Sequence, residues 1–331
     1  MGNLTISISP HLKGRNSTAK IMLDVIIAML PAFAAGVFFF GLRALTVTAV
    51  TVAAAVLSEF LFEKLCKRDI TVGDLSAVVT GIILAMNFPV SIPYWQAALG
   101  SVIAIVVVKQ LFGGIGFNFA NPASTARIVL LSSFGSTLSH WVAPKDISFT
   151  TMNMADLTTS ATPMANIPVA DATVPSLSDM LIGNIGGSIG ETCSIAIIIG
   201  LVYLIARRVI TPHIPLVIIG TVFVLGLFLA PEVISSSINV TGIKNVDYAI
   251  YNVISGGLLF GAVFMATDYV TSPVTGWGKV IFGIGCGFIT FMIRRFGNLP
   301  EGISYGILLM NSLTPYIDRV TATKPFGGVK K

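Results

Sequence analysis

Long apolar stretches alternate with short polar or glycine-rich segments along most of the chain. Apolar runs cover residues 21–40, 45–62, 95–108, 193–206, 216–230, 280–293 and 303–317. A bilayer core of about 30 Å needs roughly 20 apolar residues per helix, so these runs and shorter ones between them predict about ten transmembrane helices. Backbone polar groups in lipid must be satisfied internally, which leaves helices or a closed barrel, and the long unbroken runs favour helices. We therefore predict an all-α integral membrane protein.

Composition and charge agree with a membrane protein. Of the 331 residues, 54% are hydrophobic and 11% are charged, which is too apolar for a soluble domain of this size. The net charge is +5, but the basic residues form short clusters at predicted helix ends, such as Arg207 with Arg208. This pattern is typical of topology signals, so we expect the lipid bilayer and no nucleic acid as a partner.

The distribution of Lys and Arg predicts the orientation. If every segment crosses and the N-terminus is cytoplasmic, fourteen Lys and Arg residues lie inside and five lie outside. We therefore expect both termini in the cytoplasm and the polar stretch 135–191 outside it. The basic N-terminal arm before an apolar run mimics a signal peptide, but this run contains Asp24 and continues to Phe40. It predicts a first spanning helix instead.

The two apolar halves share one pattern. Each has two long helices, a segment rich in hydroxyl side chains and glycine, a helix ending in basic residues, and a segment broken by Gly, Asn and Pro. Five crossings per half require the second copy to be inverted, and paired broken segments in such folds indicate a midplane site. The predicted parts are an N-terminal arm (1–20), a first five-helix repeat (21–134), a loop (135–191), a second five-helix repeat (192–318) and a C-terminal tail (319–331).

The segment FGGIGFNFANPASTARIVLL, residues 112–131, interrupts sequence of membrane depth. Gly113 and Gly114 permit positive φ, and Asn118 and Asn121 offer amide groups in apolar surroundings, where unpaired polar groups are costly. A planar, hydrogen-bonding ring fits this description. A re-entrant turn whose asparagines bond to the chain itself fits equally well.

Three charged residues lie in or beside the apolar segments: Asp24, Arg127 and Asp268. Charges inside a membrane are expensive, so each is a functional candidate. The alternative is an internal structural pair or a position at a helix end.

The heptapeptide DLTTSAT, residues 156–162, lies in the polar stretch between the halves. A loop of this composition is usually only solvated. Its residues resemble the consensus at which a flavin transferase joins the phosphate of FMN to a threonine hydroxyl. The matching positions are Asp156, Thr159, Ser160, Ala161 and Thr162, with Ser160 in place of the usual Gly.

Together with GGIGFNFANPA and FMATDYVTSP, in this order, DLTTSAT resembles the family that contains the B subunit of the sodium-pumping NADH:quinone reductase and the D subunit of the Rnf complex. The short N-terminal arm is more similar to the latter. The resemblance implies covalent FMN on Thr162 and a non-covalent riboflavin within the helices, with Gly113, Gly114, Asn118, Asn121 and Arg127 as candidate flavin-site residues.

The same resemblance implies membership of an electron-transfer complex in a bacterial inner membrane. Its partners would be the other membrane and peripheral subunits of an Rnf-type complex and, during maturation, a flavin transferase. It would relay electrons between ferredoxin and NAD while the assembly moves Na⁺ or H⁺, and it would not be catalytic alone. The alternative is an inverted-repeat channel or secondary transporter for a small polar solute, without redox chemistry.

Overall fold

The computed structural model describes residues 17–144, 162–167, 174–231, 234–235, 238, 240–297 and 301–322. Within these ranges the regular structure is helical and contains no β-strand. Part of the predicted flavin motif, residues 156–161, lies outside the described residues, as do most of the N-terminal arm and the end of the C-terminal tail.

The first half consists of the helices α1 (Thr18–Phe40), α2 (Leu42–Leu65), α3 (Ser76–Met86), α4 (Tyr94–Val102) and α5 (Pro122–Ser133). A 3₁₀ turn, η1 (Val72–Asp74), precedes α3, a π-helix, η2 (Ile103–Gln110), extends α4, and the short α6 (Gly135–Leu138) follows α5. The side chain of Ser17 caps α1, and Gly41, at φ 72°, separates α1 from α2. Glycine suits this position because its φ is positive.

The second half begins after two short helices, α7 (Pro163–Asn166) and α8 (Leu177–Ile182). It consists of α9 (Ser194–Ala206), α10 (His213–Phe228), α11 (Lys244–Ile254), α12 (Leu258–Phe260) with the π-helix η4 (Gly261–Met265), α13 (Gly276–Phe296) and α14 (Ile303–Thr321). Helix α11 and the α12–η4 segment meet at a bend of 58° around Ser255, Gly256 and Gly257.

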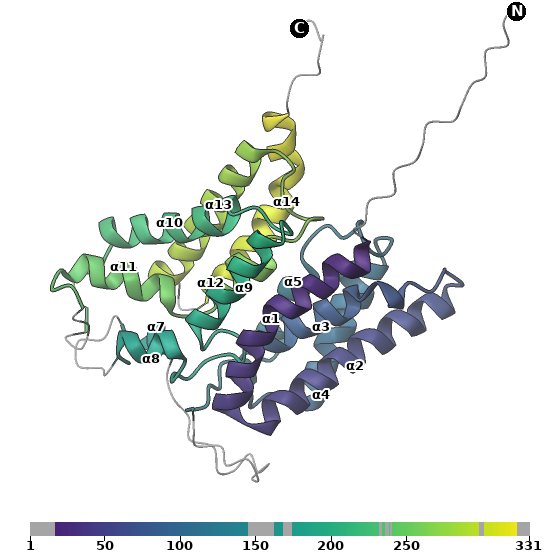
Figure 1. The fold of residues 1–331 in the computed structure, drawn as a ribbon, viewed down its shortest axis with the longest axis horizontal. Helices are drawn as coiled ribbons and strands as arrows, with labels where there is room; N and C mark the ends of the chain where they lie inside the picture. Colours follow the sequence, from purple (N-terminus) through teal and green to yellow (C-terminus); the bar gives the residue numbers. More distant parts are fainter. Residues whose placement is uncertain are drawn as a thin grey trace, which may run out of the picture.

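Corresponding helices of the two halves make corresponding contacts. Helix α2 packs against α3 and α4, and α10 packs against α11 and α13. The halves meet where α1 packs against α9 and α5 packs against α14. Helix α14 ends at the top of the view, whereas α7 and α8 lie on the left (Figure 1). A Cβ on Gly200 of α9 would collide with the backbone carbonyl of Ala28, so glycine permits the close approach to α1.

Irregular backbone lies buried where the two halves meet. The amide of Gly190 donates to the carbonyl of Met86 over 2.8 Å, and that of Ile189 donates to the carbonyl of Phe88 over 3.1 Å. These bonds join the end of α3 to the segment that precedes α9. Such backbone is tolerated at membrane depth because protein, and not lipid, surrounds it.

Among the residues that the structure describes, three helices, α1, α2 and α13, are long and apolar enough to cross a membrane, or four spans if the bent pair of α11 and α12–η4 counts as one. Several other expected spans form shorter helices, among them α3, α9 and α10. Helix α11 corresponds to none of the long apolar runs of the sequence. Its buried face carries Asp247, Tyr248 and Tyr251, so it is an amphipathic helix.

Candidate functional site

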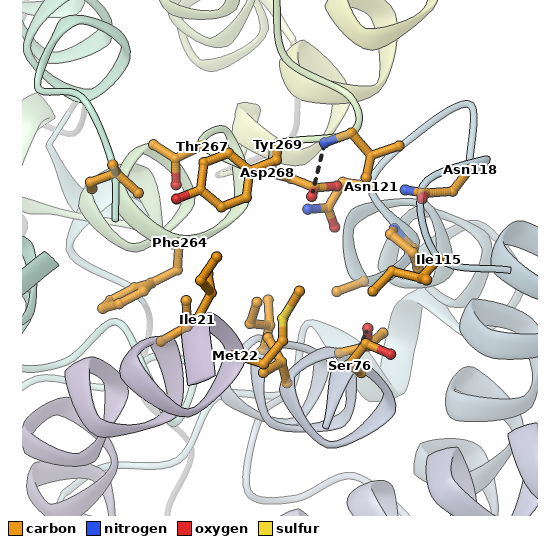
Figure 2. Close-up of a pocket in the computed structure, with 18 of the residues that line it drawn as sticks. Ile21, Met22, Ser76, Ile115, Asn118, Asn121, Phe264, Thr267, Asp268 and Tyr269 are labelled. Atoms are coloured by element: carbon orange, nitrogen blue, oxygen red, sulfur yellow. Dashed lines mark hydrogen bonds between the residues drawn. The ribbon is translucent and has the colours of Figure 1, made fainter. Parts of the chain in front are cut away.

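A pocket opens between the two halves at the end where α1 begins. The space that protein atoms leave there, including the open mouth, is about 830 Å³. Figure 2 shows Ile21 and Met22 of α1 on one side, Thr267, Asp268 and Tyr269 after η4 on the opposite side, and an open space between them. The walls are mainly apolar, with a few polar groups.

A buried ion pair forms part of the pocket wall. The ammonium of Lys109, on η2, contacts Glu59 Oε1 of α2 and Ser76 Oγ of α3, each at 2.6 Å. Gln110 Nε2 donates to the same Glu59 oxygen over 2.8 Å. Lys109 and Ser76 line the pocket, and Glu59 is 0% exposed. A buried charge needs such a partner, so this pair fixes α2, α3 and η2 to one another.

The two predicted asparagines line the pocket, but both also hold the backbone. Asn121 Oδ1 accepts from the amide of Ser124 and caps α5, while Asn121 Nδ2 donates to the carbonyl of Met265 over 3.0 Å. Asn118 Nδ2 donates to the carbonyl of Ala120 over 3.1 Å. Their amide groups satisfy the chain itself, as the structural alternative has it, and the expectation that they bind a flavin stays a prediction.

The glycines of the same segment shape the loop and do not line the pocket. Gly113, Gly114 and Gly116 have φ of 126°, 95° and 89°, in the left-handed region that the sequence led us to expect. Ile115, between them, contributes the loop's apolar side chain to the pocket. The candidate roles of Gly113 and Gly114 are therefore conformational.

Arg127 lies in the middle of α5, away from the pocket lining. Its guanidinium forms an ion pair with Glu301, which precedes α14, and Nη1 donates to Asn87 Oδ1 over 2.9 Å. Arg127, Asn87 and Glu301 line a second, smaller cavity near Ser139. The internal pair that we considered as an alternative is present.

Of the other two predicted charges, Asp24 is in an ion pair and Asp268 is held by hydrogen bonds. Asp24 of α1 accepts from Arg207 at 3.2 Å and from the hydroxyl of Tyr203 at 3.1 Å, so it joins α1 to the end of α9. Asp268 accepts from the hydroxyl of Thr271 over 3.2 Å and lines the pocket.

Thr162 is placed at the N-cap of α7, with extended backbone at φ −65° and ψ 150°. We expected a hydroxyl group on an uncluttered loop, yet the residue is only 3% exposed. The residues that follow it are buried as well: Met164 and Ile167 are little exposed, and the hydroxyl of Ser255 donates to Met164 Sδ over 2.8 Å. Asp156, Thr159, Ser160 and Ala161 lie outside the described residues.

Sequence reasoning missed the acidic partners. Glu59, Glu191 and Glu301 are buried, and each contacts a residue that is distant in the sequence. The only sequence signal was their position: Glu59 in an apolar run, and Glu191 and Glu301 beside glycines at the edge of one.

The fold and the pocket together define a multi-pass membrane protein with a cavity between two groups of helices. Comparison with known proteins makes this class specific. The model of the NQR2, RnfD, RnfE family matches residues 5–327, and the chain belongs to this family.

Similar proteins align with this chain over nearly their whole length. The D subunit of the Na⁺-translocating ferredoxin:NAD⁺ oxidoreductase complex of Acetobacterium woodii is 43% identical, over 99% of this chain and 96% of that protein. The D subunit of the proton-translocating ferredoxin:NAD⁺ oxidoreductase complex of Clostridium ljungdahlii is 39% identical, over 98% and 96%. The D subunit of an ion-translocating oxidoreductase complex of Stutzerimonas stutzeri is 36% identical, over 95% and 93%.

Proposed function

We propose that this chain is the flavin-carrying membrane subunit of a complex that couples electron transfer between ferredoxin and NAD to the movement of Na⁺ or H⁺. The observation that carries the proposal is the match, over nearly the whole chain, to relatives named as the D subunit of such complexes. The chain would act with the other membrane and peripheral subunits of the assembly and would not be catalytic alone.

The pocket suits a non-covalent flavin such as riboflavin. A flavin ring has an apolar end and a polar, hydrogen-bonding end, and the pocket provides apolar walls together with Asn118, Ser76 and Lys109. A bound flavin would accept and donate electrons there. The protein's own groups would position the flavin and set its electrostatic environment. Among the residues that line the pocket, Lys109 carries a positive charge and is our candidate for the electrostatic role.

Thr162 is the proposed attachment point of covalent FMN through a phosphoester. The motif carries this part of the proposal, and the extended backbone at Thr162 is compatible with it. Because α7 is docked, we infer that the flavin transferase acts on the segment while it is undocked.

The proposed orientation places the pocket side in the cytoplasm of a bacterial cell and Thr162 on the outer side of the inner membrane. Two further pockets adjoin the main one at the same end of the molecule. Basic residues line them, and an excess of Lys and Arg is typical of the cytoplasmic side; these residues are Lys20, Arg207, Arg208 and Lys279. The matching contacts of α2 and α10 support two inverted five-helix repeats with ten crossings in all. Helices shorter than a full span would then form parts of broken crossings.

The covalent flavin is tested on gels. The full chain, produced together with a flavin transferase and denatured, should give a fluorescent band under ultraviolet light, and Thr162→Ala should remove the fluorescence. Thr158→Ala, at a variable position of the same motif, is the matched control and should keep it. A dark wild-type band would refute attachment and favour the channel or transporter alternative.

The non-covalent flavin is tested separately. Thr80→Trp places an indole in the pocket, so acid extraction of the purified chain should release at least about tenfold less flavin than from the wild type, as expected when the site is filled. Leu57→Trp, on the exposed face of α2, is the control and should release as much as the wild type. Equal release from both variants would place the flavin elsewhere.

A further inference from the structure

Two carboxylates share one arginine at the centre of the protein. Arg127 is 4% exposed and is paired with Glu301. Glu191, before α9, is also buried and interacts electrostatically with Arg127. A methyl group on Gly257 would lie 3.2 Å from Glu191 Oε2 and 3.8 Å from Arg127 Nη1, so the two side chains approach the same point of the backbone. Arg127 is therefore placed to serve either carboxylate.

Two cations and two carboxylates meet around Arg127. The other cation, Arg294 of α13, interacts with Glu191, and its guanidinium also donates to the carbonyls of Asn252, Ser255 and Gly256. The remaining titratable group that acts on Arg127 is Tyr305 of α14. With both glutamates ionised the four charges balance, but Glu191 Oε2 also accepts from the amide of Gly257, whereas one oxygen of Glu301 has no partner in the described part of the chain. A buried charged oxygen without a donor is costly, so protonation of Glu301 relieves that cost.

Glu301 has one carboxyl oxygen, Oε1, at which a proton can bind. Its Oε2 faces Arg127, whereas its Oε1 is buried and has no hydrogen-bond partner within the described part of the chain. Glu301 lines the second cavity, whose volume of about 20 Å³ is enough for one water molecule. The exposed Ser139 is part of the wall, so this cavity lies next to the surface.

A proton fits this cavity better than a metal cation. A protonated carboxyl gains an O–H donor that a single water can accept. A metal ion would need several oxygen ligands, and a guanidinium beside the same carboxylate would repel it.

We propose that the Glu301 carboxyl is a proton-binding site reached from the Ser139 side, with Arg127 paired to Glu301 when that carboxyl is ionised and to Glu191 when it is protonated. Proton uptake at Glu301 thus moves a buried positive charge toward α9. The proposal needs no flavin and stands apart from the proposed function.

A chain of contacts links this site to the main pocket. Asn121, which lines the pocket, donates to the carbonyl of Met265, and Asn87 Nδ2 donates to Met265 Sδ over 3.4 Å. The Oδ1 of Asn87 accepts from Arg127. A movement of Arg127 therefore changes the bonding of Asn87, whose contact Met265 in turn binds the pocket residue Asn121.

Infrared difference spectroscopy of the purified full chain, titrated with acid, tests the proposal. The wild type should show the C=O stretch of a buried carboxylic acid, and this band should be lost in Glu301→Gln and return, shifted, in Glu301→Asp. Glu63→Gln is the matched control and should keep the band, because Glu63 is also buried but accepts from Thr71 and Gln110 and does not line this cavity. A band unchanged in Glu301→Gln, or displaced competitively by Na⁺, would overturn the assignment.

The exchange of Arg127 has its own test in the same titration. In Glu191→Gln, Arg127 loses its second carboxylate and stays with Glu301, so the midpoint of the Glu301 band should move to lower pH by at least about one unit. In Arg127→Gln the midpoint should move to higher pH by at least about as much. A midpoint that Glu191→Gln leaves in place would refute the exchange.

Discussion

Breaking the buried pair of Lys109 and Glu59 should strongly destabilise the protein. In Lys109→Met the methionine fills a similar volume, but Glu59 stays fully buried, with Gln110 as a neutral donor and one oxygen already unpartnered. Removing one partner of a buried ion pair typically costs about 3–5 kcal/mol, because an uncompensated charge remains. We expect a loss of this size in the free energy of unfolding.

The double variant separates charge from packing. Glu59→Leu combined with Lys109→Met removes both charges, and replacing a buried pair by apolar residues is often neutral or stabilising by about 1–4 kcal/mol. We therefore expect it to be more stable than Lys109→Met. Ser76 loses its contact with the ammonium in both variants, so that loss cancels in the comparison.

Reversible unfolding in mixed micelles, followed by tryptophan fluorescence, gives the free energies for the wild type and the variants. The three tryptophans of the chain supply the signal. Ion pairs that are screened by solvent typically contribute less than about 1 kcal/mol. If Lys109→Met lowered the free energy of unfolding by less than this, water would screen the pair, and our description of Lys109 and Glu59 as a buried ion pair would be wrong.

The remaining predictions concern a close helix contact, a helix cap and the exposure of two thiols. Gly200→Val should separate α1 from α9 and cost about 1–3 kcal/mol of unfolding free energy, whereas Gly220→Val, with open space beside it, should cost less than about 1 kcal/mol; equal costs would refute this packing. Asn121→Ala should lose both the cap of α5 and the bond to the Met265 carbonyl, and so cost at least about 1 kcal/mol in thermal unfolding; a smaller loss would contradict this account. A maleimide should label the exposed Cys66 in the folded chain but the buried Cys286 only after denaturation; early labelling of Cys286 would contradict the fold.

The sequence predicted what depends on apolar length and on glycine. The long helices α1, α2 and α13 coincide with long apolar runs, and the positive φ values of Gly113, Gly114 and Gly116 coincide with a segment that no regular helix could contain. Both properties are local, so neighbouring residues are enough to indicate them.

The sequence could not predict what depends on tertiary contact. Helix α11 carries Lys244 and Asp247 in its first turn and looks like a polar connection, because only the folded chain shows that Asp247 is buried and accepts from the amides of Val240 and Thr241. Arg127 was predicted as a candidate site residue, but its partner Glu301 belongs to the other half of the chain. No local pattern pairs them.

The burial of Thr162 has a consequence for biosynthesis. A threonine that is only 3% exposed as a residue leaves a second enzyme little access to its side chain. If that threonine is the flavin acceptor, as we propose, the transferase has to act on a nascent or partly assembled chain. At that stage the hydrogen bond between Ser255 and Met164 has not yet formed. A chain that buries Thr162 before the transferase has acted would stay without covalent FMN. The supply of FMN during synthesis, and not afterwards, would therefore set the fraction of chains that carry the flavin.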